Sequence, residues 1–170
     1  QELCRIQDRK SSTVPLGLIT VAAMLPPDWE LRLVDLNTRP LTQSDWDFAE
    51  VVLFSCMGVQ HASFKDLVRQ AKALGKTVVA GGPFPSVLPE EVMAAGCDFV
   101  VRGEAELLMP QLLEGLKQGR TGSVYEATEK PDLSFSPIPR FDLLQPDGYI
   151  SMAIQTTRGC PFDCEFCDVV

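Results

Sequence analysis

Positive charge is scarce in this sequence of 170 residues, in which 15 Lys and Arg stand against 23 Asp and Glu and leave a net charge of −8. A chain this acidic has no broad positive field that would attract phosphate groups. We therefore expect neither nucleic acid nor an anionic membrane surface as a partner.

Long hydrophobic runs and an export signal are also absent. No apolar run reaches the roughly 18 residues that a membrane-spanning helix needs. The first dozen residues are polar and of mixed charge, unlike a secretory signal. We expect a cytoplasmic protein without a membrane span. Hydrophobic residues still make up 45% of the chain, as in an ordinary globular protein of about one domain.

The six cysteines are unevenly placed along the chain. Three stand singly, and a disulfide framework is unusual in a chain that can build a core and carries no export signal. The other three form a C-x3-C-x2-C motif, for which metal ligation is the better interpretation: Cys160, Cys164 and Cys167. We expect the sequence to be part of a longer protein, because such a motif needs more protein around it to work.

Apolar runs with strand character alternate with segments of helical spacing. Strands are predicted at 31–36, 51–55, 77–80 and 98–102, and helices at 15–25, 63–74, 89–95 and 104–117. This alternation predicts an α/β fold, with a parallel sheet and helices on both faces. Such sheets bind ligands beyond the carboxyl ends of their strands, which here are residues 55–60, 81–85 and 103–106.

The character of the sequence changes after the last predicted helix. Residues 119–148 are rich in proline and polar residues and predict an extended linker. We expect this linker to be partly ordered by apolar side chains that pack on a neighbour, namely Phe135, Ile138, Phe141, Leu143 and Leu144. A strand predicted at 149–157 then leads into the cysteine motif, where a second domain starts.

The cysteine motif can hold an iron–sulfur cluster, because three thiolates bind three irons of a cubane and leave the fourth open to a small molecule. Its spacing, Phe166 before the last cysteine and the entry through Arg158-Gly159 resemble the cluster loop of the radical S-adenosylmethionine (SAM) enzymes. The resemblance implies a 4Fe-4S cluster on the three cysteines, with Phe166 shielding it from water. It also implies SAM cleaved to a 5′-deoxyadenosyl radical, and an electron donor such as flavodoxin or ferredoxin.

Three segments at the predicted strand ends resemble the cobalamin-binding domains that precede the barrel in one branch of this superfamily. A corrin ring is large and flat, so backbone must approach it closely, which glycine permits. The resemblance implies that cobalamin contacts a serine loop, a double-glycine loop and a Gly-Glu-x-Glu turn. These comprise Ser55, Cys56, Met57, Gly58 and Val59, then Gly81, Gly82 and Pro83, then Gly103, Glu104 and Glu106.

Two departures from this family pattern are informative. The motif Asp-x-His-x-x-Gly, which places a histidine on cobalt in other cobalamin domains, is absent. The resemblance therefore implies a cobalamin whose lower face has no histidine from that motif. We expect His61, the one histidine, to start a helix near the pocket rather than to bind cobalt. Residues 1–13 show no convincing strand, so we expect the sheet to lack the first strand with which family members begin.

The resemblance covers residues 14–168 and implies three parts. These are a flavodoxin-like (Rossmann-like) cobalamin-binding domain over 1–118, a proline-rich linker over 119–148, and the start of a radical SAM partial TIM barrel over 149–170. Segments 15–18, 34–37, 139–144 and 158–162 are similar to the subgroup that contains hopanoid C-2 methylases. The implied enzyme is a methyltransferase that acts on an unactivated carbon of a small molecule or lipid. By itself, the chain is expected to be inactive.

Two alternatives stay open. Cobalamin and radical chemistry could serve a rearrangement, which the mass of the product would distinguish from methylation. The chain could instead be a flavodoxin-like binding module whose cysteines hold zinc. Zinc in structural sites takes four ligands, however, and neither a histidine nor a fourth cysteine lies near the motif.

Overall fold

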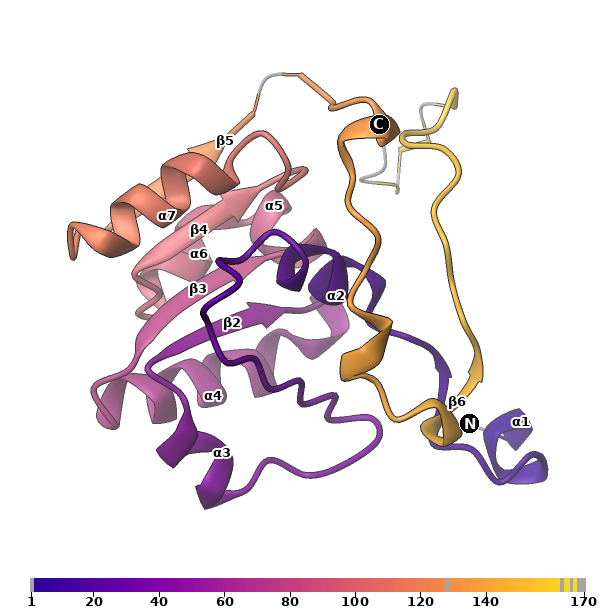
Figure 1. Ribbon diagram of the computed structural model, residues 1–170. Coiled ribbons are helices and arrows are strands. Elements are labelled where there is room, and N and C mark those ends of the chain that lie inside the picture. The colour runs from indigo at the N-terminus through magenta and orange to yellow at the C-terminus, as the bar shows by residue number, and fades with distance from the viewer. Residues whose placement is uncertain (1, 128, 163, 166, 168–170) are drawn as a thin grey trace. The chain divides into compact units, whose positions relative to one another are not determined.

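The computed structural model describes residues 2–127, 129–162, 164–165 and 167 (Figure 1). The chain divides into two compact units, each built from two segments. The first, called the paired-strand unit, is Gln1–Phe48 with Ser136–Thr156. The second, called the sheet unit, is Ala49–Phe135 with Thr157–Val170. The domain boundaries expected at residues 118 and 148 stay a prediction.

The sheet unit is built on four parallel strands in the order β2-β3-β4-β5. They are β2 (Val51–Ser55), β3 (Thr77–Gly81), β4 (Phe99–Arg102) and β5 (Ser123–Glu126). The first three form where the sequence has short runs of apolar and β-branched residues, which favour buried parallel strands. The fold is therefore α/β with a parallel flavodoxin-like sheet, as the sequence predicts.

The helices of the sheet unit follow the strands in turn. They are η1 (Gly58–Gln60), α4 (His61–Ala73), α5 (Pro83–Val87), α6 (Pro89–Ala94), α7 (Met109–Lys117) and η2 (Leu133–Phe135). The apolar spacing of α4 buries Phe64, Val68 and Ala71. Three of these helices, α5, α6 and α7, have proline in the first turn, where its missing N–H costs nothing.

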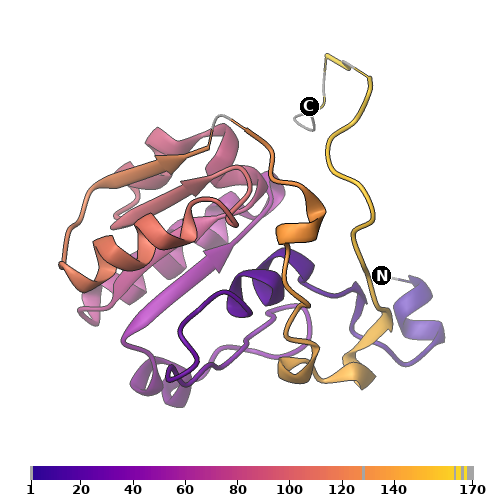
Figure 2. The same ribbon diagram turned by 45° about the horizontal axis from the view of Figure 1, so that its top comes forward.

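Helices cover both faces of this sheet, as the sequence predicts. Successive side chains of a strand point to opposite faces. Phe54 shares a face with Val100 through the strand register, and its ring lies edge-on against Phe64 of α4, with centroids 5.7 Å apart. Phe99 points to the other face, where its Cε1 would lie 3.1 Å from a Cβ added to Gly115 of α7. Helices α4 and α7 therefore lie on opposite faces (Figure 2).

The paired-strand unit joins the start of the chain to a much later segment. Its elements are α1 (Glu2–Ile6), β1 (Ser11–Thr13), α2 (Leu16–Ala22), α3 (Gln43–Phe48), η3 (Phe141–Leu143), η4 (Pro146–Gly148) and β6 (Tyr149–Ser151). Strands β1 and β6 pair in parallel, with Ser11 opposite Tyr149 (Figure 1). Val14, Ile19, Leu144 and Tyr149 form a small buried core.

One expectation about the start of the chain is confirmed in part, and one strand prediction is wrong. Among the described residues, the four-stranded sheet contains no strand from residues 2–13, as expected, but a short strand, β1, does form there and pairs with β6. Residues 31–36, predicted as a strand, form none. There the Asp35 carboxylate accepts hydrogen bonds from the Asn37 N–H and from Tyr149 Oη, at 2.9 and 3.0 Å. This side chain closes a turn, which competes with pairing along a strand.

The predicted linker also differs from the structure. It contains β5, whose residues pair with β4 from Phe99↔Ser123 to Arg102↔Glu126. Phe141 and Leu144 pack in the core of the paired-strand unit as expected, but Phe135 and Ile138 are 71% and 86% exposed. The expectation that these last two side chains pack on a neighbour is therefore wrong for this chain.

Three elements are clearly shorter than the sequence predicts. Helix α2, predicted over 15–25, ends at Ala22. Helix α7 begins at Met109 rather than near residue 104, because the preceding residues form a turn in which the Ala105 carbonyl accepts from Leu108 and Met109. Strand β6 ends at Ser151, since β1 offers it only three residues to pair with. Among the described residues, no helix is both long and apolar enough to cross a membrane.

Candidate functional site

The serine loop and the double-glycine loop meet at the carboxyl ends of β2 and β3. Gly82 has φ +90° and ψ −168°, a conformation essentially limited to glycine. A Cβ on this residue would lie 2.6 Å from Ser55 Oγ, so glycine lets the two loops approach closely. The Phe84 N–H also donates to the Cys56 carbonyl at 3.1 Å. Two segments that the sequence predicts for one site are thus in direct contact.

Ser86 joins the double-glycine loop to the end of β4. Its hydroxyl donates to the Gly82 carbonyl at 2.8 Å and accepts from the Gly103 N–H at 2.9 Å. The Ser86 carbonyl accepts from Arg102 Nε at 2.7 Å. Sequence reasoning missed this residue, since a serine inside a short helix carries no motif of its own. Its position four residues after a paired glycine was the only available signal.

Gly103 is a second glycine of the predicted site with a left-handed backbone conformation. It has φ +82°, and a Cβ there would meet no atom within 4 Å, so the space beside it is open. Met57 and Val59 are exposed apolar residues at the end of β2, at 58% and 92%. Open space beside a glycine and exposed apolar side chains at the carboxyl ends of the strands suit the binding of a large flat ring.

Cys56 and His61 have more local roles. The Cys56 side chain is buried, and burial raises the pKa of its thiol to about 11. His61 is the first residue of α4, as expected, and its Nδ1 donates to the Gly58 carbonyl at 2.9 Å. The His61 N–H donates to the same carbonyl, so the residue is tied twice to the 3-10 turn before the helix.

The two glutamates of the Gly-Glu-x-Glu turn contact Arg158. Glu106 Oε1 accepts a hydrogen bond from Arg158 Nη2, and Glu104 Oε1 lies 3.6 Å from Arg158 Nε. The side chains of Arg158 and Glu106 are only 6% and 4% exposed, whereas that of Glu104 is 38% exposed. The Glu106 carboxylate is thus paired with the Arg158 guanidinium of the same chain. The Gly-Glu-x-Glu motif did not predict this contact.

The three motif cysteines are exposed, and the Cys167 N–H donates to the Cys164 carbonyl at 3.0 Å. Within the described part of the chain, no three His, Cys, Asp or Glu side chains are grouped closely enough to hold a metal. Phe166 lies outside the described residues. The assignment of Cys160, Cys164 and Cys167 as cluster ligands stays a prediction that rests on their spacing.

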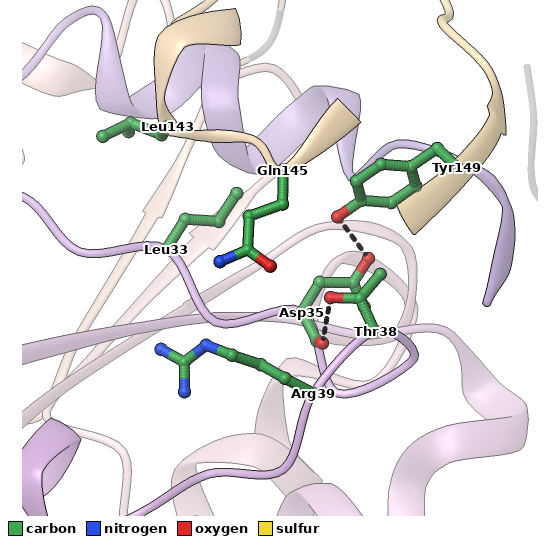
Figure 3. Close-up of a pocket in the computed structure, with 7 residues that line it drawn as sticks. All are labelled: Leu33, Asp35, Thr38, Arg39, Leu143, Gln145 and Tyr149. Carbon is green, nitrogen blue, oxygen red and sulfur yellow. Dashed lines mark hydrogen bonds between the residues drawn. The ribbon is translucent and has the colours of Figure 1, made fainter. Parts of the chain in front are cut away.

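A small pocket lies in the paired-strand unit (Figure 3). Its volume of about 30 Å³ has room for water but not for a corrin ring. Burial, together with a hydrogen bond to Asp35, raises the pKa of Tyr149 at its wall to about 12. None of the predicted cofactor-binding residues lines it; its walls are Leu33, Asp35, Thr38, Arg39, Leu143, Gln145 and Tyr149.

We expect alkylation to separate the cysteines into two groups. Burial raises the pKa of the Cys56 and Cys97 thiols to about 11 and 12, and only the thiolate reacts rapidly. At pH 8 iodoacetamide should modify the exposed cysteines about 100-fold faster, because burial both covers the Cys56 and Cys97 thiols and keeps them protonated. Mass spectrometry of the quenched peptides measures this, with urea-unfolded chain as the control in which the difference disappears. Rapid labelling of Cys56 in the folded chain would contradict the buried position of its side chain.

Comparison with known proteins agrees with the resemblance. Residues 4–113 match the B12-binding domain family, and the chain belongs to that family. A Synechocystis protein described as an uncharacterized methyltransferase is 48% identical over the whole chain. The hopanoid C-2 methylase of Rhodopseudomonas palustris is 32% identical over 91% of the chain. The bacteriochlorophyllide d C-8(2)-methyltransferase of Chlorobaculum tepidum is 31% identical over 89%. The chain spans about a third of the length of these relatives, at 32%, 30% and 34%.

Proposed function

We propose that the chain is the cobalamin-binding part of a cobalamin-dependent radical SAM methyltransferase. The observation that carries the proposal is the arrangement of the strand ends in a chain of the B12-binding domain family, where Gly82 packs directly against Ser55 and the space beside Gly103 is open. The domain is proposed to cover residues 1–118, followed by the linker 119–148 and the start of the radical SAM domain at 149–170.

The names of the relatives favour methylation over rearrangement, since the three compared above are a methylase and two methyltransferases. In the proposed enzyme, cobalamin would supply a methyl group. A 4Fe-4S cluster with SAM would supply the 5′-deoxyadenosyl radical that makes an unactivated carbon reactive. The substrate would be a small molecule or lipid, for which a hopanoid-like compound is the first to test.

The residues of this chain would each serve binding or positioning. Gly82 and Gly103 would let backbone N–H and carbonyl groups approach the corrin, and Met57 and Val59 would cover its apolar surface. Ser86 would hold the loops at a fixed spacing through its bonds to the residues 82 and 103. Cys160, Cys164 and Cys167 would ligate iron, as their spacing indicates.

The first test is metal and cofactor content. The chain is purified without oxygen, reconstituted with iron and sulfide, incubated with hydroxocobalamin, desalted, and analysed for cobalt, iron and zinc. We expect cobalt near one per chain, with the absorbance spectrum of bound cobalamin. Zinc without cobalt would contradict the proposal and favour a binding module with a zinc loop. Product mass, measured with the longer protein and its substrate, would separate methylation from rearrangement.

A further inference from the structure

A buried ion pair joins two segments of the sheet unit that are 52 residues apart in the sequence. Arg158 Nη2 donates to Glu106 Oε1, and both side chains are almost fully buried. Arg158 Nε also lies 3.6 Å from Glu104 Oε1, so the guanidinium faces both carboxylates of the turn. The arginine stands two residues before Cys160, and the glutamates follow β4 directly.

The chemistry of this pair suits positioning rather than general stabilisation. Burying two charges costs solvation energy that their attraction repays only in good geometry, so such pairs contribute little net stability. A planar guanidinium whose Nε and Nη2 each face a carboxylate along one edge is, however, fixed in orientation as well as in distance. By contrast, the pair of Arg102 with Glu126 in the same unit is exposed on both sides, and such pairs position little.

We propose that Arg158 is a positioning residue that anchors the cysteine loop to the Gly-Glu-x-Glu turn. The turn belongs to the proposed cobalamin edge, and the loop carries the proposed iron ligands, so the ion pair sets the spacing between the two cofactor sites. That this contact positions two cofactor sites rests on the proposed function. The anchor itself is a contact of the chain without any cofactor.

Backbone dynamics of the cofactor-free chain test the anchor. We compare the wild type with Arg158→Gln, Arg158→Lys and Glu106→Gln, and use Glu126→Gln as the matched control because it removes an exposed carboxylate. The NMR order parameters of the amides of residues 157–160 and 162 should fall from about 0.85 to below about 0.6 in Arg158→Gln and Glu106→Gln and stay unchanged in Glu126→Gln. Arg158→Lys should restore part of the order, because lysine keeps the charge but not the planar fork. Slow hydrogen exchange at the amides of Val78 and Val79 in β3 shows that each variant remains folded.

Hydroxocobalamin titration of the same proteins separates failure of the anchor from failure of the proposed function. Unchanged order parameters at residues 157–160 and 162 in folded Arg158→Gln would overturn the anchor, whether or not cobalamin binds. An equal loss of order in Arg158→Gln and Glu126→Gln would also overturn it, since the effect would then not depend on this charge pair. If the wild type fails to bind cobalamin but the loop loses order in Arg158→Gln, the anchor stands and the proposed function is contradicted.

Discussion

Replacement of Gly82 by alanine is expected to reduce hydroxocobalamin affinity at least tenfold and to destabilise the sheet unit. An alanine Cβ would lie 2.6 Å from Ser55 Oγ, so one of the two loops must move. The residue also has φ +90° and ψ −168°, where a non-glycine residue costs about 1 to 3 kcal/mol. Absorbance titration measures the binding, and urea unfolding followed by circular dichroism measures the stability.

Two further variants separate the causes of this effect. Gly119→Ala places a Cβ at φ +62° with no atom within 4 Å, before β5 and away from the predicted cofactor residues. It should lose stability through backbone strain but keep its affinity. Ser55→Ala combined with Gly82→Ala removes the hydroxyl that clashes and should recover part of the lost stability. Full cobalamin affinity in Gly82→Ala would show that the double-glycine loop does not approach the ligand.

Replacement of Asp45 by asparagine is expected to cost about 2 kcal/mol of stability, because it leaves cationic and backbone donors without a charged acceptor. Asp45 is buried at the start of α3, where its Oδ1 and Oδ2 each accept from Arg39 at 2.8 Å. Its Oδ2 also accepts from the Thr42 N–H and hydroxyl, at 2.9 and 2.7 Å. The Asp45 carboxylate thus accepts both bonds from Thr42 and ties the first turn of the helix to the residue before it.

Because of the same carboxylate, we expect the free energy of unfolding to fall at acid pH. Hydrogen bonds from Arg39, followed by those from Thr42, hold the pKa of Asp45 well below its usual range. A depressed folded pKa contributes stability above the unfolded pKa of about 4, and this contribution is lost as the pH falls below that value. Urea unfolding between pH 3 and 7 should therefore show a steeper loss of stability for the wild type than for Asp45→Asn.

Asp142→Asn is the matched control for this prediction. Asp142 also pairs with an arginine, Arg140, at 2.7 Å, but both side chains are largely exposed. Exposed pairs contribute little, so this variant should unfold at nearly the wild-type urea concentration. Equal losses in the two variants would contradict the role assigned to the buried cap.

The elements that the sequence predicts well are those with a local cause. Strand β2 and the apolar core of β3 stand out because Val51–Ser55 and Thr77–Gly81 are short apolar runs between helices. Helix α4 follows from apolar residues at helical spacing. The helix predicted at 89–95 forms as α6, where proline and two glutamates occupy the first turn. Each of these signals lies within a few residues of the structure that it produces.

The elements that the sequence misses depend on distant partners. Strand β5 has no strong apolar run, and forms because β4 offers it free backbone groups. Strand β1 exists because β6, more than a hundred residues later, pairs with it. Residues 31–36 have an alternating pattern but become no strand, since the Asp35 side chain closes a turn there. A strand needs a second strand, and the pattern of one segment does not reveal it.

The sequence by itself determined the fold class, the places where glycine must lie and the cysteine spacing, because these depend on local pattern and composition. Only the tertiary structure decided which loops touch. It brought Gly82 against Ser55, placed Ser86 between two strand ends, and buried Glu106 against Arg158. These contacts join residues far apart in the chain. The first two form because a parallel sheet brings the carboxyl ends of its strands to a single edge, and the third brings a much later segment to that same edge.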